Sequence, residues 1–292
     1  MKRYLFIIGI IAVVFSSCTD KIDLTLPDPE PVLVVDGFIT DRDTTQWIKL
    51  SSLENYFADP PPNFSVYKNA VVKLLEDGQE VGQYTFMDST AQFELEYKGI
   101  NGKWYQIEIL LPDGKRYKSE EEFMETVPKI DTIWSVANLN NPDASAFSAD
   151  YGVYMNTQET PGIGDYYQWK SYVNGEYQAE PQDLNFTNDQ FVDGQYVENF
   201  EVFGLSEEDY QEFKANSIDG KVWIKVEQTQ ISSRYYDFLF LVFQQTLLIG
   251  GPFAAPPAEI RGNVYLEGGN EEFALGYFYA ASVDTKTVLI VE

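Results

Sequence analysis

Ser65 and Lys68 have a spacing that suggests catalysis, because they form the motif S-x-x-K. In serine acylases this spacing places a nucleophilic serine at the start of a helix and a lysine one turn later. Here Pro60 to Pro62 precede the pair, a β-rich run follows it, and neither the S-D-N nor the K-T-G partner motif occurs. We therefore interpret the match as a coincidence.

Oxygen-rich side chains gather in a polar segment between residues 181 and 200. They are Asp183, Asn185, Asp189 and Asp193. Ca²⁺ prefers hard oxygen ligands of this kind, but the segment lacks the spacing, the glycine and the closing glutamate of an EF-hand. We interpret the segment as a long solvated loop, with a calcium site as the alternative.

A group of aromatic residues follows one another closely between residues 166 and 177. They are Tyr166, Tyr167, Trp169, Tyr172 and Tyr177. On a strand, Tyr167 and Trp169 would share one face, whereas Tyr166 and Tyr172 would share the other. We interpret the group mainly as core packing. The alternative is a ligand or partner surface made of Tyr166, Tyr167, Trp169 and Tyr172, since aromatic rings combine apolar area with polar handles.

Histidine is absent, and Cys18 is the only cysteine among 292 residues. No Ser-His-Asp or Cys-His machinery and no histidine-based zinc or haem site is therefore possible. We expect no catalytic residue, cofactor or metal ligand, and we interpret the protein as non-enzymatic. A glycosidase needs only two suitably spaced carboxylates, but no pair stands out among 46 acidic residues. A carboxylate-dependent hydrolase acting on an extracellular polysaccharide stays as an alternative.

Acidic residues outnumber basic ones by 46 to 20, which gives a net charge of −26. Loss of residues 1–17 would remove Lys2 and Arg3 and no acid, so the remaining chain would carry −28. Nucleic-acid binding needs Lys and Arg to neutralise phosphates. We therefore exclude nucleic acid as a partner and interpret the acidic surface as one that keeps copies of the chain apart.

The first 31 residues have the pattern of an export signal and a tether. The apolar stretch Leu5 to Phe15 is shorter than the roughly 20 residues that span a membrane, and it has the length of a signal-peptide core. The string Phe15-Ser16-Ser17-Cys18 resembles the lipobox of bacterial lipoproteins. The resemblance implies that residues 1–17 are removed and that Cys18 carries the lipid, at the start of a tether over residues 18–31. An ordinary secretory peptide with an incidental cysteine is the alternative.

Residues 32–126 show the pattern of short strands. Asp77-Gly78 and Pro112-Asp113-Gly114 each lie between two apolar runs and are hairpin signals. About six or seven strands in this length indicate an antiparallel sandwich of the immunoglobulin-like or transthyretin-like type.

Residues 127–292 predict a second β-rich domain with one or two helices. One helix is expected near 206–216, with Ser206 as its N-cap, and another near 233–248, with Ser232 or Ser233 as its N-cap and Gly250-Gly251 as its stop. The second helix is apolar on nearly every face, so we expect it to be buried.

Several stretches together resemble a known family. They are "LVVDGFITD", "NAVVKLLEDG", "LPDGKRYKSE", "VPKIDTIW" and, towards the C-terminus, "PFAAPPAEIRGN" and "LGYFYAAS". With the lipobox, they are similar to the DUF4249 domain-containing lipoproteins of Bacteroidota, over nearly the whole chain after residue 17. That family has no assigned activity and supplies no catalytic residues. Its members often accompany TonB-dependent outer-membrane receptors.

We therefore expect a lipoprotein anchored in the cell outer membrane and exposed at the surface. Asp20, just after Cys18, is similar to the acidic export signals of surface lipoproteins in such bacteria. We expect a TonB-dependent receptor, an extracellular nutrient ligand, or both, as partners. A purely structural surface protein is a further alternative.

Overall fold

The computed structural model describes residues 32–53, 65–139, 149–180, 183–247, 260–269 and 272–291. The predicted signal peptide, the predicted lipid attachment site Cys18 and the predicted tether lie outside the described residues. Gly250-Gly251 does too. Among the described residues, no helix is long and apolar enough to cross a membrane.

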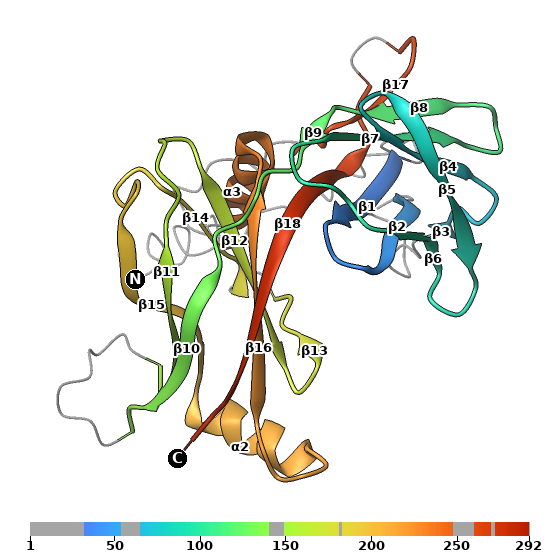
Figure 1. Cartoon of the computed structure of the whole chain (residues 1–292). Coiled ribbons are helices and arrows are strands. Elements are labelled where there is room, and N and C mark those ends of the chain that lie inside the picture. The colour runs from blue at the N-terminus through green and yellow to red at the C-terminus, as the bar shows by residue number, and fades with distance from the viewer. Residues whose placement is uncertain are drawn as a thin grey trace, which may run out of the picture. The chain divides into compact units, whose positions relative to one another are not determined.

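The described chain is mainly β with two helices and has a sandwich-like arrangement of sheets, as predicted (Figure 1). The earlier strands are β1 (Val32–Thr40), β2 (Thr44–Leu53), β3 (Ser65–Val66), β4 (Val71–Glu76), β5 (Gln79–Met87), β6 (Gln92–Tyr97), β7 (Trp104–Leu110), β8 (Arg116–Ser119) and β9 (Glu122–Phe123). The later strands are β10 (Ile130–Ala137), β11 (Tyr151–Gln158), β12 (Tyr166–Val173), β13 (Glu176–Tyr177), β14 (Asn185–Asn188), β15 (Tyr196–Leu205), β16 (Trp223–Ile231), β17 (Val264–Leu266) and β18 (Leu275–Leu289). The helices are α2 (Glu207–Asn216) and α3 (Ser233–Leu247).

Most strands belong to one sheet, in the order β13-β12-β16-β18-β1-β2-β6-β5-β4-β7-β8-β17, from which β3, β9 and β14 branch. The strands β10, β11 and β15 form a second sheet, in that order. The segment 181–200, expected to be a loop, instead contains β14 and the start of β15. Its polar side chains hide the strand pattern, because the four residues of β14 are only half-buried.

The first hydrophobic core lies among β1, β2 and β4 to β8. Its fully buried side chains include Val35, Ile48, Leu74 and Ile107. Both predicted hairpins are present. Asp77 and Gly78 turn β4 into β5 with φ angles of 47° and 75°, and positive φ at both central residues suits the right-handed twist of paired strands.

The second core lies between the three-stranded sheet and the β12-β16 part of the large sheet. Val153, Trp169 and Val226 are buried in it. Helix α2 closes one side, where Tyr210 stacks on Tyr151 with ring centroids 4.1 Å apart. The Ser206 side chain accepts a hydrogen bond from the Asp209 amide, so it caps the helix as expected.

Helix α3 packs on the opposite face of β12, β16 and β18. Tyr235 and Leu239 are buried there, and the Tyr235 ring stacks on Tyr279 at 4.3 Å. Ser232 caps the helix by accepting a hydrogen bond from the Tyr235 amide, at 3.2 Å. The expectation that this helix is buried is confirmed for the side facing the sheet only, because Phe240 and Leu241 are 43% and 42% exposed.

Strand β18 connects the two halves of the large sheet, as the long red strand of Figure 1 shows. Its first part pairs with β1, with Gly276 opposite Val35, and its second part pairs with β16. The pairing with β1 is parallel, whereas the strands within residues 32–126 pair with one another in antiparallel fashion, as predicted. The first core also takes Phe278 and Ala280 from β18.

Close backbone contacts surround this junction. A Cβ at Gly276 would lie 2.0 Å from the Val35 carbonyl oxygen, and one at Gly262 would lie 1.9 Å from the Gly276 carbonyl oxygen. The side chain of buried Asn263 accepts a hydrogen bond from the Phe278 amide at 3.0 Å and donates one to the Phe278 carbonyl at 2.7 Å. Residues that carry the family resemblance therefore meet at one structural junction.

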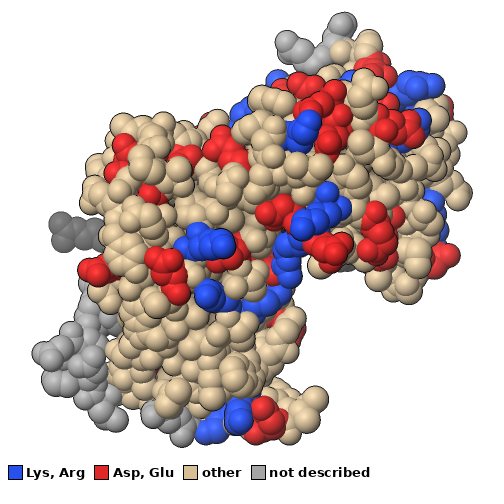
Figure 2. Space-filling model, in the orientation of Figure 1, with Lys and Arg blue, Asp and Glu red and all other residues tan. Residues whose placement is uncertain are grey.

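Charged side chains of both signs lie close together on the face shown in Figure 2. The nearly buried Glu227 forms ion pairs with Arg42 and Lys225. Burial opposes its ionisation, but the Lys225 hydrogen bond and the Arg42 charge hold the pKa of Glu227 below its usual range.

Candidate functional site

Two loops meet at one end of the second core, between the three-stranded sheet and the large sheet. One contains Glu159 to Asp165 and joins β11 to β12, and the other contains Asp189 to Gln195 and joins β14 to β15. Strand β11 pairs with β15, with Gln158 opposite Tyr196, while β12 pairs with β14. Each loop therefore crosses from one sheet to the other at the same end, and the pairing brings the loops together.

Hydrogen bonds hold the two loops to one another. The Gly164 amide donates to both carboxylate oxygens of Asp189, at 3.2 and 2.9 Å. In the other direction, the Gly194 amide donates to Glu159 Oε2. Gly164 and Gly194 have φ angles of 127° and 65°, so both amides are presented by backbone conformations that favour glycine.

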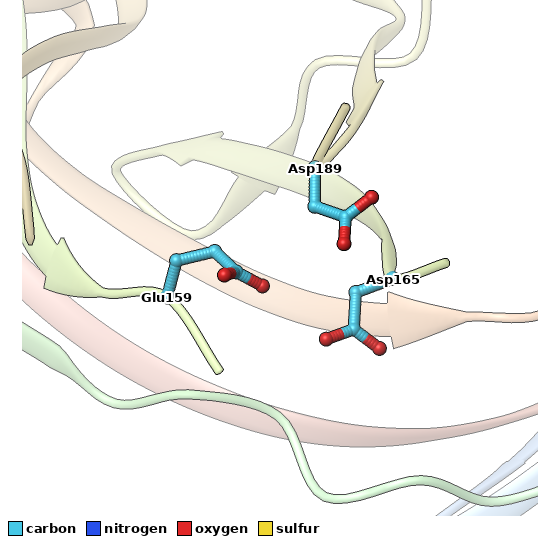
Figure 3. Close-up of side chains that lie close together, drawn as sticks. All are labelled: Glu159, Asp165 and Asp189. Atoms are coloured by element: carbon cyan, nitrogen blue, oxygen red, sulfur yellow. The ribbon is translucent and has the colours of Figure 1, made fainter. Parts of the chain in front are cut away.

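The carboxylates of Glu159, Asp165 and Asp189 point towards one another between these loops (Figure 3). One oxygen from each lies within 4.8 Å of the other two. The residues are 2%, 9% and 2% exposed, respectively. Burial of like charges at this separation is unfavourable unless hydrogen bonds, protons or a cation compensate them. We call these three residues the carboxylate cluster.

The hydrogen-bond donors to the side chains of the carboxylate cluster are neutral. Besides the two glycine amides, Tyr167 donates its hydroxyl to Glu159 Oε1 at 2.9 Å. Gln230 Nε2 donates to Asp165 Oδ1 at 2.6 Å and to Glu125 Oε2 at 2.8 Å. Gln230 therefore links a fourth carboxylate to the cluster.

This environment shifts the pKa of Asp165. Burial, and after it the negative charges of Glu125 and Glu159, together raise the pKa of its carboxyl from 3.8 to about 7. Burial likewise raises the pKa of Tyr167, as do the charges of Asp165 and Glu159. The Tyr167 hydroxyl therefore keeps its proton and acts as a donor.

An apolar cavity of about 180 Å³ lies beside the carboxylate cluster. Its lining includes Glu159, Tyr167, Trp169, Phe191, Val192 and Phe200. The Trp169 and Phe200 rings pack with centroids 4.7 Å apart, whereas Phe191 is 82% exposed. An engineered apolar cavity of about 150 Å³ accommodates benzene, so this cavity is large enough for an aromatic ring.

Polar groups at the cavity wall already have partners. Trp169 Nε1 donates to Gln228 Oε1 at 2.9 Å, and Gln228 Nε2 donates to the Pro128 carbonyl at 2.8 Å. An entering group would therefore be selected by shape and apolar contact more than by new hydrogen bonds.

The predicted aromatic set is divided between two faces of β12. Tyr167 and Trp169 lie in the second core and line the cavity. On the other face, Tyr166 packs on Tyr236 of α3 at 5.0 Å, and Tyr172 donates its hydroxyl to Glu227 at 3.0 Å. The structure therefore does not bring the four predicted surface residues together.

The oxygen-rich residues of segment 181–200 also separate. Asp189 joins the carboxylate cluster, but Asp193 accepts from the Gly162 amide at 2.6 Å. Asp183 accepts from the Glu180 amide at 3.2 Å, and Asn185 donates to the Val202 carbonyl at 2.8 Å. The sequence reasoning missed Glu159, Asp165 and Gln230. Two glycines between the two acids in "ETPGIGD" were the available signal, and nothing in the sequence marked Gln230.

Ser65 and Lys68 do not lie on a helix. Ser65 begins the short strand β3, and Lys68 forms an ion pair with Asp88 at 3.0 Å. The geometry required by a helical S-x-x-K motif is absent from this pair.

Comparison with known proteins agrees with the resemblance in the sequence. Residues 19–287 match the model of a family described as "Domain of unknown function (DUF4249)". The chain belongs to this family. A search of curated proteins finds no match.

Proposed function

We propose that this protein is a non-enzymatic lipoprotein of the Bacteroidota outer membrane that binds an extracellular ligand and assists a TonB-dependent receptor in nutrient uptake. The observation that carries the binding role is the apolar cavity beside Trp169. Concave, mostly apolar sites with a few polar groups are where small ligands bind. The ligand would place an apolar or aromatic group in this cavity.

The anchor is supported by the order of residues around Cys18, where an apolar stretch, two serines and a cysteine follow one another. Attachment of two or more acyl chains would hold the protein stably at a membrane. A negative net charge favours a covalent lipid over a polybasic contact with anionic lipid.

The hydrolase alternative gains no support from the cavity. Among the described lining residues, Glu159 is the only carboxylate, and it faces Asp165 and Asp189. Glycosidases use two carboxyl groups on either side of the bond that is cleaved.

Lipidation is tested in cells with a palmitate analogue. The wild-type protein should be labelled and recovered with membranes, whereas Cys18→Ser should be unlabelled. Equal labelling of both proteins would contradict the anchor. Protease added to intact cells should cleave the wild-type protein if it is surface-exposed, and protection from protease would contradict that placement.

The receptor partnership is tested by pulling down the tagged native protein from detergent-solubilised outer membrane. Recovery of a TonB-type channel with wild-type protein, and not with Cys18→Ser, is the expected result. Recovery of no such channel would count against the receptor role.

The cavity is tested by the thermal shift that small aromatic compounds cause. Val192→Trp should fill the cavity and abolish the shift, whereas Val81→Trp on exposed β5 is the matched control and should keep it. A shift of equal size in both variants would contradict binding in the cavity.

A further inference from the structure

We propose that Glu159, Asp165 and Asp189 bind a divalent cation, Ca²⁺ by the chemistry of the ligands. The inference is independent of the lipid anchor and of the receptor. It begins with geometry: one oxygen of each residue lies within 4.8 Å of the other two. Calcium–oxygen distances are 2.3–2.6 Å, so two ligands of one ion lie at most about 5 Å apart. Three oxygens with this spacing fit around one ion.

A second observation comes from Gln230, which belongs to β16 and is not acidic. Its side chain is 4% exposed and reaches the cluster, because Nε2 is 2.6 Å from Asp165 Oδ1. Its Oε1 is buried and has no hydrogen-bond partner in the described structure. Bond lengths within a carboxamide place that oxygen no more than about 5 Å from Asp165 Oδ1. Ionised carboxylates accept hydrogen bonds and cannot donate them, and a cation bound among them would give this oxygen a partner.

The charge around the carboxylate cluster also favours a bound cation. Glu125 adds a further carboxylate through Gln230. Across the residues that the structure describes, no Lys or Arg forms an ion pair with Glu125 or with any member of the cluster. The groups that donate hydrogen bonds to these carboxylates are amides and a tyrosine hydroxyl, which carry no charge. A divalent cation would supply the missing positive charge.

Calcium suits this site better than magnesium. The ligands come from two loops and a strand, and Ca²⁺ accepts 6–8 oxygens in flexible geometry, whereas Mg²⁺ requires near-ideal octahedral geometry. Waters would complete the coordination. Because Glu159 lines the cavity and Asp189 precedes Phe191 and Val192 in its wall, a bound cation would also hold one side of the cavity in place.

Calcium titration of the purified full chain, after chelator treatment and dialysis in detergent, tests the proposal by calorimetry. We expect one Ca²⁺ per chain with a dissociation constant of about 10⁻³ M or tighter, as in extracellular calcium modules. The double variant Glu159→Gln/Asp189→Asn should weaken binding at least about tenfold, a loss equivalent to about 1.4 kcal/mol. Glu198→Gln, which removes one charge from an exposed position of β15, should bind as the wild type does.

Terbium gives a second readout on the unmodified protein. Tb³⁺ in the cluster would lie near Tyr167, whose hydroxyl is 2.9 Å from Glu159 Oε1, so excitation of tyrosine should sensitise terbium luminescence. Calcium should displace terbium at lower concentration than magnesium does. Absence of saturable Ca²⁺ binding and of sensitised luminescence in the folded wild-type protein would overturn the proposal. So would unchanged binding in a folded double variant.

Discussion

Gly276 offers a sharp test of the parallel pairing between β1 and β18. Its φ is 79°, and a Cβ added there would lie 2.0 Å from the Val35 carbonyl oxygen and 3.0 Å from the Val35 carbonyl carbon. These are backbone atoms, so no side-chain rotation can relieve the contact. Gly276→Ala therefore requires the two strands to move apart.

The expected cost has two parts. A residue with a Cβ in a left-handed conformation loses about 1 kcal/mol, and overpacking against a neighbour costs about 1–3 kcal/mol more. We expect Gly276→Ala to lower the free energy of unfolding by about 3 kcal/mol. Gly268→Ala is the matched control, because Gly268 has a φ of 76° and nothing lies within 4 Å of its added Cβ. Its cost should be about 1 kcal/mol.

Urea unfolding followed by tryptophan fluorescence measures both values. The change of glycine to alanine has the same effect on the unfolded chain in the two variants, so the difference between them isolates the contact with Val35. If the two variants lost the same free energy, within about 0.5 kcal/mol, the close approach of β18 to β1 would be refuted.

Three further changes test the junction, the carboxylate cluster and the cavity wall. Asn263→Ala should lower the free energy of unfolding by about 3 kcal/mol, because it leaves the buried amide and carbonyl of Phe278 unpaired. Urea unfolding measures this loss, and a value below about 1 kcal/mol would contradict the prediction. Because the pKa of Asp165 is raised from 3.8 to about 7, the folded state binds more protons than the unfolded state between these values. Stability from this group is therefore fully present below about pH 4 and is lost as pH rises through 7. Asp165→Asn should reduce the fall in the free energy of unfolding between about pH 4 and pH 7, measured in the presence of chelator. An unchanged slope would contradict the raised pKa of Asp165. Trp169→Phe should cost about 1–2 kcal/mol, because it removes the donor to Gln228 Oε1, and a thermal melt showing no loss would contradict it.

Local signals predicted much of the fold. Asp77-Gly78 supplied a two-residue turn, and its geometry depends on those two residues alone. Helix α2 was also predictable, because Ser206 and three acidic residues mark its first turn.

The pairing of β1 with β18 could not be predicted in this way. Val35 and Gly276 are separated by most of the chain, and a parallel pair leaves no turn signal between its strands. Short-range patterns record which face of a strand is apolar, but not which distant strand lies beside it.

The carboxylate cluster was hidden for a similar reason. Glu159 and Asp165 flank one loop, Asp189 begins another, and Gln230 comes from β16. In the sequence, Asp189 stands among other oxygen-rich residues, including Asp183 and Asp193, and far from Glu159 and Asp165. In the fold, the carboxylates close to Asp189 are instead Glu159 and Asp165 of the β11–β12 loop, because β14 pairs with β12.

The position of β18 in the large sheet has a consequence for biogenesis. Val35 and Ile39, near the start of the described residues, pack in a core completed by Phe278 and Ala280. During vectorial synthesis, the first core therefore cannot close until those later residues have emerged. We expect early strands with unsatisfied edges to be exposed for most of that time, a state that is prone to aggregation.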